Sequence, residues 1–505
     1  MLKLGLRGIL IWMVLLLPFP LWADSGKKED DKKDKKIEDR MAALEKELAQ
    51  IKSQKSQGSS IWVVPKWLGV GLGGQYRIMG NASNFGWHAK TLTRDQTSTS
   101  FINQRFRTWL NLHEKQAKNV GVYFQLEIGH NMWGDDREGP KTHRANGNEV
   151  GLELRRGFLW LKFWKSHLLR VGVQSFHDRF GEKPDFQKDW LFSVDQYDSF
   201  GAVLANSIWD FNVGGISLEG SFKKSYHYRL GWYLLGGGTT FTGRNAANLL
   251  ASDLDIELGN HLFGGSLYYL RDKGDYSYGN FGGPKTAAGY DHAWDLWAGL
   301  RGHISFSKQL LFSFFIIYNH GEVAGPLYIH NGWAFKGALT ANLKKAGTIR
   351  FQTIYSTGSK NTRDSSSFRT IAQSERDDLG SQGYWSFLGL TSPWGPSDVK
   401  DLGVSLQNQG LGLLTIQASY EKGLTSFLTG YLGLGWLQSA SPNPNNDKKD
   451  MGLEVFLELT WTINKIVNFK TGFSYFMTGD FYKASTGVGN PDDLYEAYFR
   501  MQIEF

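Results

Sequence analysis

The sequence predicts an all-β protein, a transmembrane antiparallel β-barrel of about 18 strands (16–18) with a short N-terminal helical or coiled-coil extension. Apolar and polar residues alternate with a period of two over most of the chain after residue 60, as in strands with one apolar and one wetted face. The 19 Trp, 21 Tyr and 33 Phe coexist with a mean hydropathy of -0.36. Alternation explains how a high aromatic content occurs with a low mean hydropathy, because a polar or small residue follows each lipid-facing one. The last residue of the final alternating strand is aromatic, Phe505.

Bulk composition limits the class of function. The 505 residues include no Cys, which excludes disulfides, thiolate zinc sites, iron–sulfur clusters and covalently attached c-type haem. We therefore expect no cofactor. The formal net charge of +7 is modest for this length, and we expect no nucleic-acid partner.

The N-terminal residues 1–23 have the features of a secretory signal peptide. Lys3 and Arg7 form a positive end, and residues 9–17 form an uninterrupted apolar core. This core is too short to span a bilayer comfortably, so we expect cleavage after Ala23 and export. An uncleaved anchor is the alternative.

Residues 24–60 form a charged extension that we place in the periplasm. Apolar residues separated by alternating steps of four and three follow the a and d positions of a heptad: Ile37, Met41, Leu44, Leu48 and Ile51. This spacing predicts a coiled coil over residues 37–51 that joins barrels, most simply as a homotrimer. A lone solvated amphipathic helix is the alternative. Residues 54–60 are a flexible Ser/Gln/Gly linker.

Residues 61–505 form the predicted outer-membrane barrel, in which short turns alternate with long polar loops. We expect strands at 68–80, 101–114, 119–132, 149–163, 167–175, 211–222, 226–236, 251–258, 262–272, 292–307, 309–320, 332–342, 348–357, 411–422, 426–437, 450–464, 466–478 and 495–505. An even count requires 176–210 to be a single outer connection. In that case residues 200–206 extend the next strand above the membrane.

Charge placement along the strands indicates which face is wet. In the 450–464 strand, Leu453 and Leu457 alternate with Glu454 and Glu458. A lipid-facing Arg or Lys at mid-depth costs about 2–4 kcal/mol, so strand charges should face the lumen. The 309–320 strand is apolar on both faces, and we expect it to pack against an inward loop or a neighbouring subunit.

Several segments resemble the alginate-export family of outer-membrane barrels. They are L-E-L-R-R-G-F-L-W-L-K-F-W-K-S-H-L-L-R-V-G-V-Q at 152–174, N-Q-R-F-R at 103–107, G-Y-W-S-F-L at 383–388 and the final strand pair. The resemblance implies an eighteen-stranded monomeric barrel. One departure is Val173, which stands where the family has the Arg of Gly-Arg-Gln.

Strand alternation places a set of basic residues inside the lumen as candidate pore-lining and solute-binding groups. They are Arg77, Arg105, Arg107, Arg155, Arg170, Arg229, Arg301, Lys336, Arg350, Lys470 and Arg500. Acids on the same face include Glu127, Glu153, Asp255, Glu257, Asp295, Glu421, Glu454, Glu458, Glu496 and Glu504. We expect a basic wall opposite an acidic wall, and a transverse field between them. The alternative is that these charges pair across the lumen and stiffen the wall. The loops at 358–402 and 176–210 are candidates for inward folding.

These features predict a passive channel in the bacterial outer membrane, in contact with outer-membrane lipid and passing small hydrophilic or anionic solutes. Export of a polyuronate-like polymer is a finer alternative that the resemblance implies. A structural or adhesive barrel is the alternative from another class. We expect no enzyme, because His113, His130, His143, His177 and His303 show no catalytic spacing to Ser or Asp.

Overall fold

The computed structural model describes residues 65–84, 99–132, 152–164, 166–180, 210–223, 225–236, 247–272, 293–323, 328–360, 364–370, 386–392, 404–464, 466–483 and 493–505. The predicted signal peptide (1–23), charged extension (24–60) and trimer segment (37–51) lie outside these ranges. The chain divides into two compact units, Met1–Leu68 and Gly69–Phe505. The fold described below is that of the second unit.

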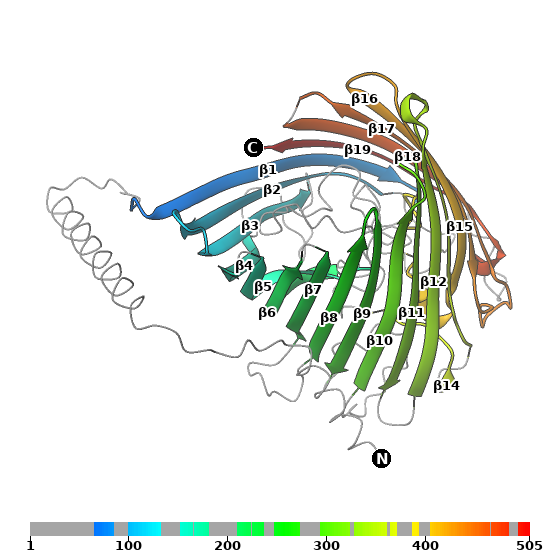
Figure 1. Cartoon of the computed structure of the whole chain (residues 1–505). Helices are drawn as coiled ribbons and strands as arrows, with labels where there is room; N and C mark the ends of the chain where they lie inside the picture. The colour runs from blue at the N-terminus through cyan, green and yellow to red at the C-terminus, as the bar shows by residue number, and fades with distance from the viewer. Residues whose placement is uncertain are drawn as a thin grey trace, which may run out of the picture. The chain divides into compact units, whose positions relative to one another are not determined.

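Nineteen strands of the described residues form one sheet, and one of them, β14 (Asp364–Ser365), is only two residues long. The other eighteen build the wall in Figure 1. Their bounds are β1 (Leu68–Ser83), β2 (Thr99–Glu114), β3 (Val120–Met132), β4 (Leu152–Phe163), β5 (His167–His177), β6 (Asp210–Phe222), β7 (Tyr226–Gly236), β8 (Ala247–Leu258), β9 (His261–Asp272), β10 (Ala293–Ser305), β11 (Leu310–Val323), β12 (Tyr328–Asn342), β13 (Thr348–Ser356), β15 (Leu413–Gly423), β16 (Leu428–Ser439), β17 (Asp450–Thr462), β18 (Val467–Thr478) and β19 (Leu494–Glu504). The predicted all-β fold with eighteen wall strands is confirmed.

The first and last strands close the barrel. β1 and β19 pair antiparallel from Gln75↔Glu504 to Ser83↔Glu496, and the two strands lie side by side in Figure 1. Gly74 and Phe505 exchange backbone hydrogen bonds of 2.8 and 3.0 Å at the seam. A Cβ on Gly74 would stand 2.5 Å from the Phe505 ring, so glycine lets the terminal aromatic lie across the seam.

Strand pairing resolves the connections that the sequence left open. β5 pairs with β6 in register from His167↔Gly220 to His177↔Asp210, so their connection adds no crossing and the predicted parity is confirmed. Residues 200–206 lie outside the described ranges. The connection after the 309–320 strand is shorter than the predicted strand bounds imply, because β11 and β12 both extend and leave only 324–327 between them. β11 and β12 pair as far as Val323↔Tyr328, so the backbone groups of these extended ends are hydrogen-bonded within the sheet.

The outer face of the wall is apolar, whereas the inner face carries the buried charged and polar strand residues together with a cluster of buried aromatic and aliphatic ones. On β17, Leu453 and Leu457 are 38% and 48% exposed, whereas Glu454 between them is buried. Lipid would solvate the exposed leucines. Among the described residues, no helix has the length and hydropathy to cross a membrane.

Loop segments pack against the inner wall. Phe180, Phe368, Phe387 and Leu390 join inward strand residues in one buried apolar cluster. The Phe180 ring lies 6.0 Å from the ring of Phe315 on β11. The apolar inner face of β11 is therefore covered by an inward loop, one of the two partners expected from the sequence. The charged residues of the longest loop that the sequence makes candidates for a constriction are Arg363, Asp364, Arg369, Glu375, Arg376, Asp377 and Asp378. Asp364 and Arg369 lie within the described ranges, where the Arg369 carbonyl accepts a hydrogen bond from Trp297 Nε1 of β10 (2.7 Å); residues 363 and 375–378 lie outside them.

Candidate functional site: a charged ladder on the inner wall

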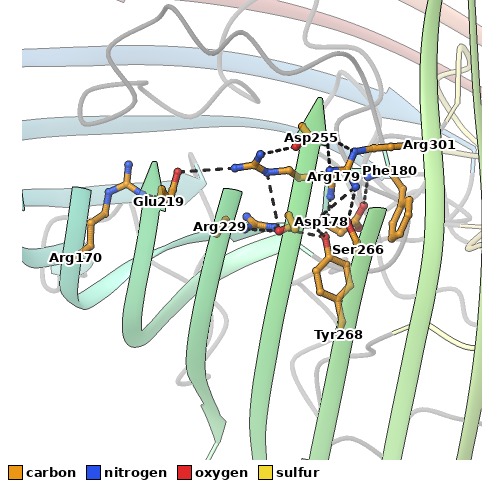
Figure 2. Close-up of polar contacts among 11 residues, drawn as sticks. Arg170, Asp178, Arg179, Phe180, Glu219, Arg229, Asp255, Ser266, Tyr268 and Arg301 are labelled. Carbon is orange, nitrogen blue, oxygen red and sulfur yellow. Dashed lines mark hydrogen bonds and ion pairs between the residues drawn. The ribbon is translucent and has the colours of Figure 1, made fainter. Parts of the chain in front are cut away.

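The candidate site is a row of charged side chains on the inner faces of β5 to β10, joined by the first residues of the β5–β6 loop (Figure 2). We call this row the charged ladder. Its members are Arg170, Arg179, Glu219, Arg229, Asp253, Asp255 and Arg301. Each wall residue stands at an inward position of its strand, because strand side chains alternate between the two faces.

Cross-strand register creates the wall pairs. Arg229 stands directly opposite Asp253, and its Nη2 lies 2.5 Å from Asp253 Oδ2. Arg170 forms an ion pair with Glu219 on the adjacent strand. Arg229 and Asp253 are both buried, so their charges are screened little by solvent.

A glycine allows the third wall pair to meet across an intervening strand. Asp255 on β8 and Arg301 on β10 both stand opposite Gly264 of β9. A Cβ on Gly264 would lie 2.7 Å from Arg301 Nε and would collide with the Asp255 carboxylate. Without that side chain, Arg301 Nη2 reaches Asp255 Oδ1 at 2.5 Å and Nε reaches it at 2.9 Å.

The β5–β6 loop adds a fourth guanidinium to the three wall pairs. Arg179 Nη1 lies 2.7 Å from Asp255 Oδ2, and its other nitrogens lie 3.9 Å from Glu219 and 4.0 Å from Asp253. Figure 2 shows Arg179 between Glu219 and Asp255, with Phe180 turned toward Arg301. The Phe180 ring packs edge-on against Tyr268 and Phe315.

Each acid of the ladder has more than one arginine partner. Each of the three wall acids has its own wall arginine, and Arg179 is shared among all three. Tyr268 donates a hydrogen bond to Asp253 Oδ1 (2.6 Å), which satisfies a second lone pair of that carboxylate. Buried charges retained with this degree of pairing are stable in place.

A second group of arginines lies on the inner faces of β1 to β4. Arg77, Arg105 and Arg107 are buried at inward positions, and Arg107 pairs with Glu127 of β3. Arg155 Nε lies 3.6 Å from the same carboxylate. Arg105 Nη2 donates to Gln75 Oε1 (2.9 Å).

The remaining predicted residues lie on other strands. Arg350 Nη1 lies 3.0 Å from Glu421, and Lys470 Nζ lies 2.8 Å from Glu458. Arg500 donates to Gln502 (2.7 Å), and Lys336 is buried on β12. On β5 to β10, the charges pair with acids on nearby strands of the same stretch of wall, which is neither a purely basic wall nor pairing across the lumen.

Strand alternation alone missed four of the charged residues in these two groups. Arg156 is buried because a bulge between Gln125 and Leu126 lets two consecutive arginines of β4 face inward. Arg179 lies in a loop, where no period exists. Glu219 and Asp253 could have been found by counting every second residue along β6 and β8, because Asp253 lies two residues from the predicted inward Asp255 and Glu219 has the inward position of its own strand.

Register also brings hydroxyls to imidazoles that the sequence spacing did not indicate. His303 Nδ1 lies 2.9 Å from Ser313 Oγ, and His227 Nδ1 lies 2.7 Å from Ser221 Oγ. Both are direct cross-strand neighbours, which is the contact expected of polar side chains on one wetted face. Within the described ranges, no group of three His, Asp or Glu is arranged to hold a metal ion.

Comparison with known proteins supports the fold. No family model matches the chain, and no curated protein matches it. Among solved structures, OccAB1 of Acinetobacter baumannii is similar at a TM-score of 0.51 and 10% identity, covering 86% of this chain and 96% of that one. The outer membrane protein OpdK of Pseudomonas aeruginosa is similar at 0.50 and 10%, covering 86% and 99%. OpdQ of the same organism is similar at 0.50 and 11%, covering 86% and 97%.

These similarities define the class by fold. The chain has the closed eighteen-stranded fold of bacterial outer-membrane barrels, which agrees with the predicted location. The alginate-export family suggested by the sequence is not among the findings, because no family model matches.

Proposed function

We propose that the protein is a passive outer-membrane channel for small hydrophilic solutes, with a preference for anions. The observation that carries this proposal is the concentration of arginines on the inner faces of β1 to β4. Five inward guanidinium groups share these strands with the buried acid Glu127: Arg77, Arg105, Arg107, Arg155 and Arg156.

The physical basis is a positive field inside an apolar wall. Low-dielectric walls focus field lines, so a surplus of one sign raises the local concentration of the opposite ion. Guanidinium groups meet carboxylates and phosphates with a planar fork. Movement then follows the solute gradient, with bound anions exchanging between neighbouring arginines.

Ion selectivity tests this proposal. Reversal potential is measured in planar bilayers under a salt gradient, for the wild type and for Arg105→Gln/Arg107→Gln. We expect the double variant to shift toward cation preference, because two lumenal positive charges are lost. Arg350→Gln is the control, because it removes a single positive charge from β13, outside the arginine group of β1 to β4, and is expected to shift the potential less. An unchanged reversal potential in the double variant would contradict the proposed anion preference.

Export of a polyuronate-like polymer is a finer version of this proposal. Its support is the resemblance of residues 103–107 and 152–174, which include Arg105, Arg107 and Arg170. Polyuronate oligomers added to one side of the bilayer are expected to interrupt the current. An uncharged oligosaccharide of similar length is the control, and equal interruption by both would remove this version.

A structural or adhesive barrel is the second candidate. It is favoured by the inward loop segments, whose residues Phe180, Phe368 and Phe387 belong to a buried apolar cluster inside the wall. The absence of any current from the purified protein in planar bilayers would favour this candidate over a channel.

A further inference from the structure

A second inward segment, residues 386–392, crosses the inner faces of β15 to β18. The backbone N–H of Phe387 donates to Gln417 Oε1 (2.7 Å), and the Tyr431 hydroxyl donates to the Phe387 carbonyl (3.0 Å). A Cβ on Gly435 of β16 would stand 2.5 Å from Leu388 Cδ1. The wall therefore leaves room for the segment and also supplies its hydrogen-bond partners.

The carboxylate of Glu454 on β17 is the centre of this contact. Its Oε1 accepts hydrogen bonds from the backbone N–H groups of Gly389 (2.8 Å) and Leu390 (2.7 Å). Its Oε2 accepts from the backbone N–H and the hydroxyl of Thr391, at 2.9 and 2.5 Å. The Ser474 hydroxyl of β18 donates to Oε1 as well. Successive backbone N–H groups that converge in this way form a concave anion site.

Glu454 differs from the ladder acids because its partners are neutral. Within the described ranges, no Lys, Arg or His side chain lies at ion-pair distance from it, and its side chain is fully buried. A buried charge is costly unless hydrogen bonds replace its hydration. Four of its five donors come from residues 389–391, so the carboxylate and the segment stabilise each other.

We propose that residues 389–391 form a carboxylate-binding site that the chain fills with its own Glu454. This internal ligand latches residues 386–392 across the wall and narrows the lumen beside β15 to β18. A free small carboxylate offers the same two oxygens, so acetate or formate occupies the site when the Glu454 side chain is removed. Of the two tests below, thiol labelling is independent of the proposed channel function, and single-channel conductance rests on it.

Thiol accessibility is the first test. The chain has no Cys, and Leu388 is only 3% exposed, so Leu388→Cys supplies a single buried thiol in the purified full chain. Adding Glu454→Ala is expected to speed its labelling by roughly tenfold, which corresponds to a loss of about 1.4 kcal/mol of anchoring. Acetate is expected to slow labelling again, and equimolar chloride is not.

Glu458→Ala provides the matched control. Glu458 lies on the same face of β17 but pairs with Lys470 at 2.8 Å, so its removal should leave labelling of the Leu388→Cys thiol unchanged. Labelling unchanged by Glu454→Ala, or raised equally by Glu458→Ala, would overturn the latch. A lack of response to acetate and formate would overturn the carboxylate site. If Glu454→Ala does not fold, Glu454→Gln is used, and an unchanged rate there overturns the latch as well.

Single-channel conductance is the second readout. Glu454→Ala is expected to lose the wild-type conductance step in favour of a larger one, and acetate is expected to restore the wild-type step. A labelling increase in a protein that passes no current would leave the latch standing and would refute the channel. An open channel whose conductance and labelling both ignore Glu454→Ala would refute the latch alone.

Discussion

Two of the loop segments that fold into the barrel are held by the wall through opposite arrangements of charge. Residues 178–180 bring a guanidinium, Arg179, to carboxylates of β6 and β8. Residues 386–392 bring backbone N–H groups to one carboxylate of β17. At the first site the wall acids have arginine partners of their own, whereas at the second the wall carboxylate depends on the loop. The first contact therefore depends on a loop side chain, Arg179, and the second depends on a wall side chain, Glu454.

The largest expected effect on stability comes from removing a ladder acid. Asp253→Asn takes the buried partner from Arg229 and weakens the hold on Arg179. Breaking a buried ion pair costs roughly 3–5 kcal/mol, because an uncompensated charge remains. Urea unfolding of the purified protein in detergent, followed by Trp fluorescence, measures the change.

An exposed acid gives the control for this prediction. Asp450 accepts a hydrogen bond from Trp436 at 3.1 Å and is exposed, so Asp450→Asn is expected to change the unfolding free energy by about 0.5 kcal/mol or less. Adding Arg229→Gln to Asp253→Asn is expected to recover part of the loss, because it removes the unpaired charge. If the losses of unfolding free energy from the two single substitutions simply add in the double variant, the pairing of Arg229 with Asp253 is contradicted.

Removing the loop's own charge should have a smaller effect. After Arg179→Gln, the three ladder acids keep Arg170, Arg229 and Arg301. We expect a loss of about 1–3 kcal/mol, in the range of hydrogen bonds to charged groups, measured by the same unfolding experiment. A loss as large as that of Asp253→Asn would show that the wall pairs need the loop, which would remove the contrast between the two segments.

The smallest effect is expected at an exposed pair outside both sites. Lys360 pairs with Asp447 on the outer loops and lowers the pKa of that carboxyl group. The stabilisation is therefore present above the ordinary Asp range and is lost as the pH falls through the lowered folded pKa. Because exposed pairs contribute little, Lys360→Gln should leave the urea midpoint unchanged at neutral pH. A clear drop at neutral pH that disappears in acid would contradict this expectation.

Much of the fold follows from the two-residue alternation of apolar and polar side chains along the strands. Alternation placed Arg170, Arg229 and Arg301 inward, because lipid and water select opposite faces of each strand. It could not place Arg156, since a bulge shifts the parity of β4. The meeting of Asp255 and Arg301 over Gly264 depends on the register of three strands, which hydrophobic patterning within each strand does not specify. Arg179 and residues 389–391 lie in loops, where tertiary contacts alone decide the conformation.

Conduction of water-soluble ions along the basic inner wall is the property on which the proposed function depends. It is measured most directly as the current of the purified wild-type protein in a planar bilayer under a potassium chloride gradient. We predict discrete steps of current and a reversal potential with the sign of a chloride-selective channel. A silent bilayer, or a reversal potential on the potassium side, would contradict the proposed channel.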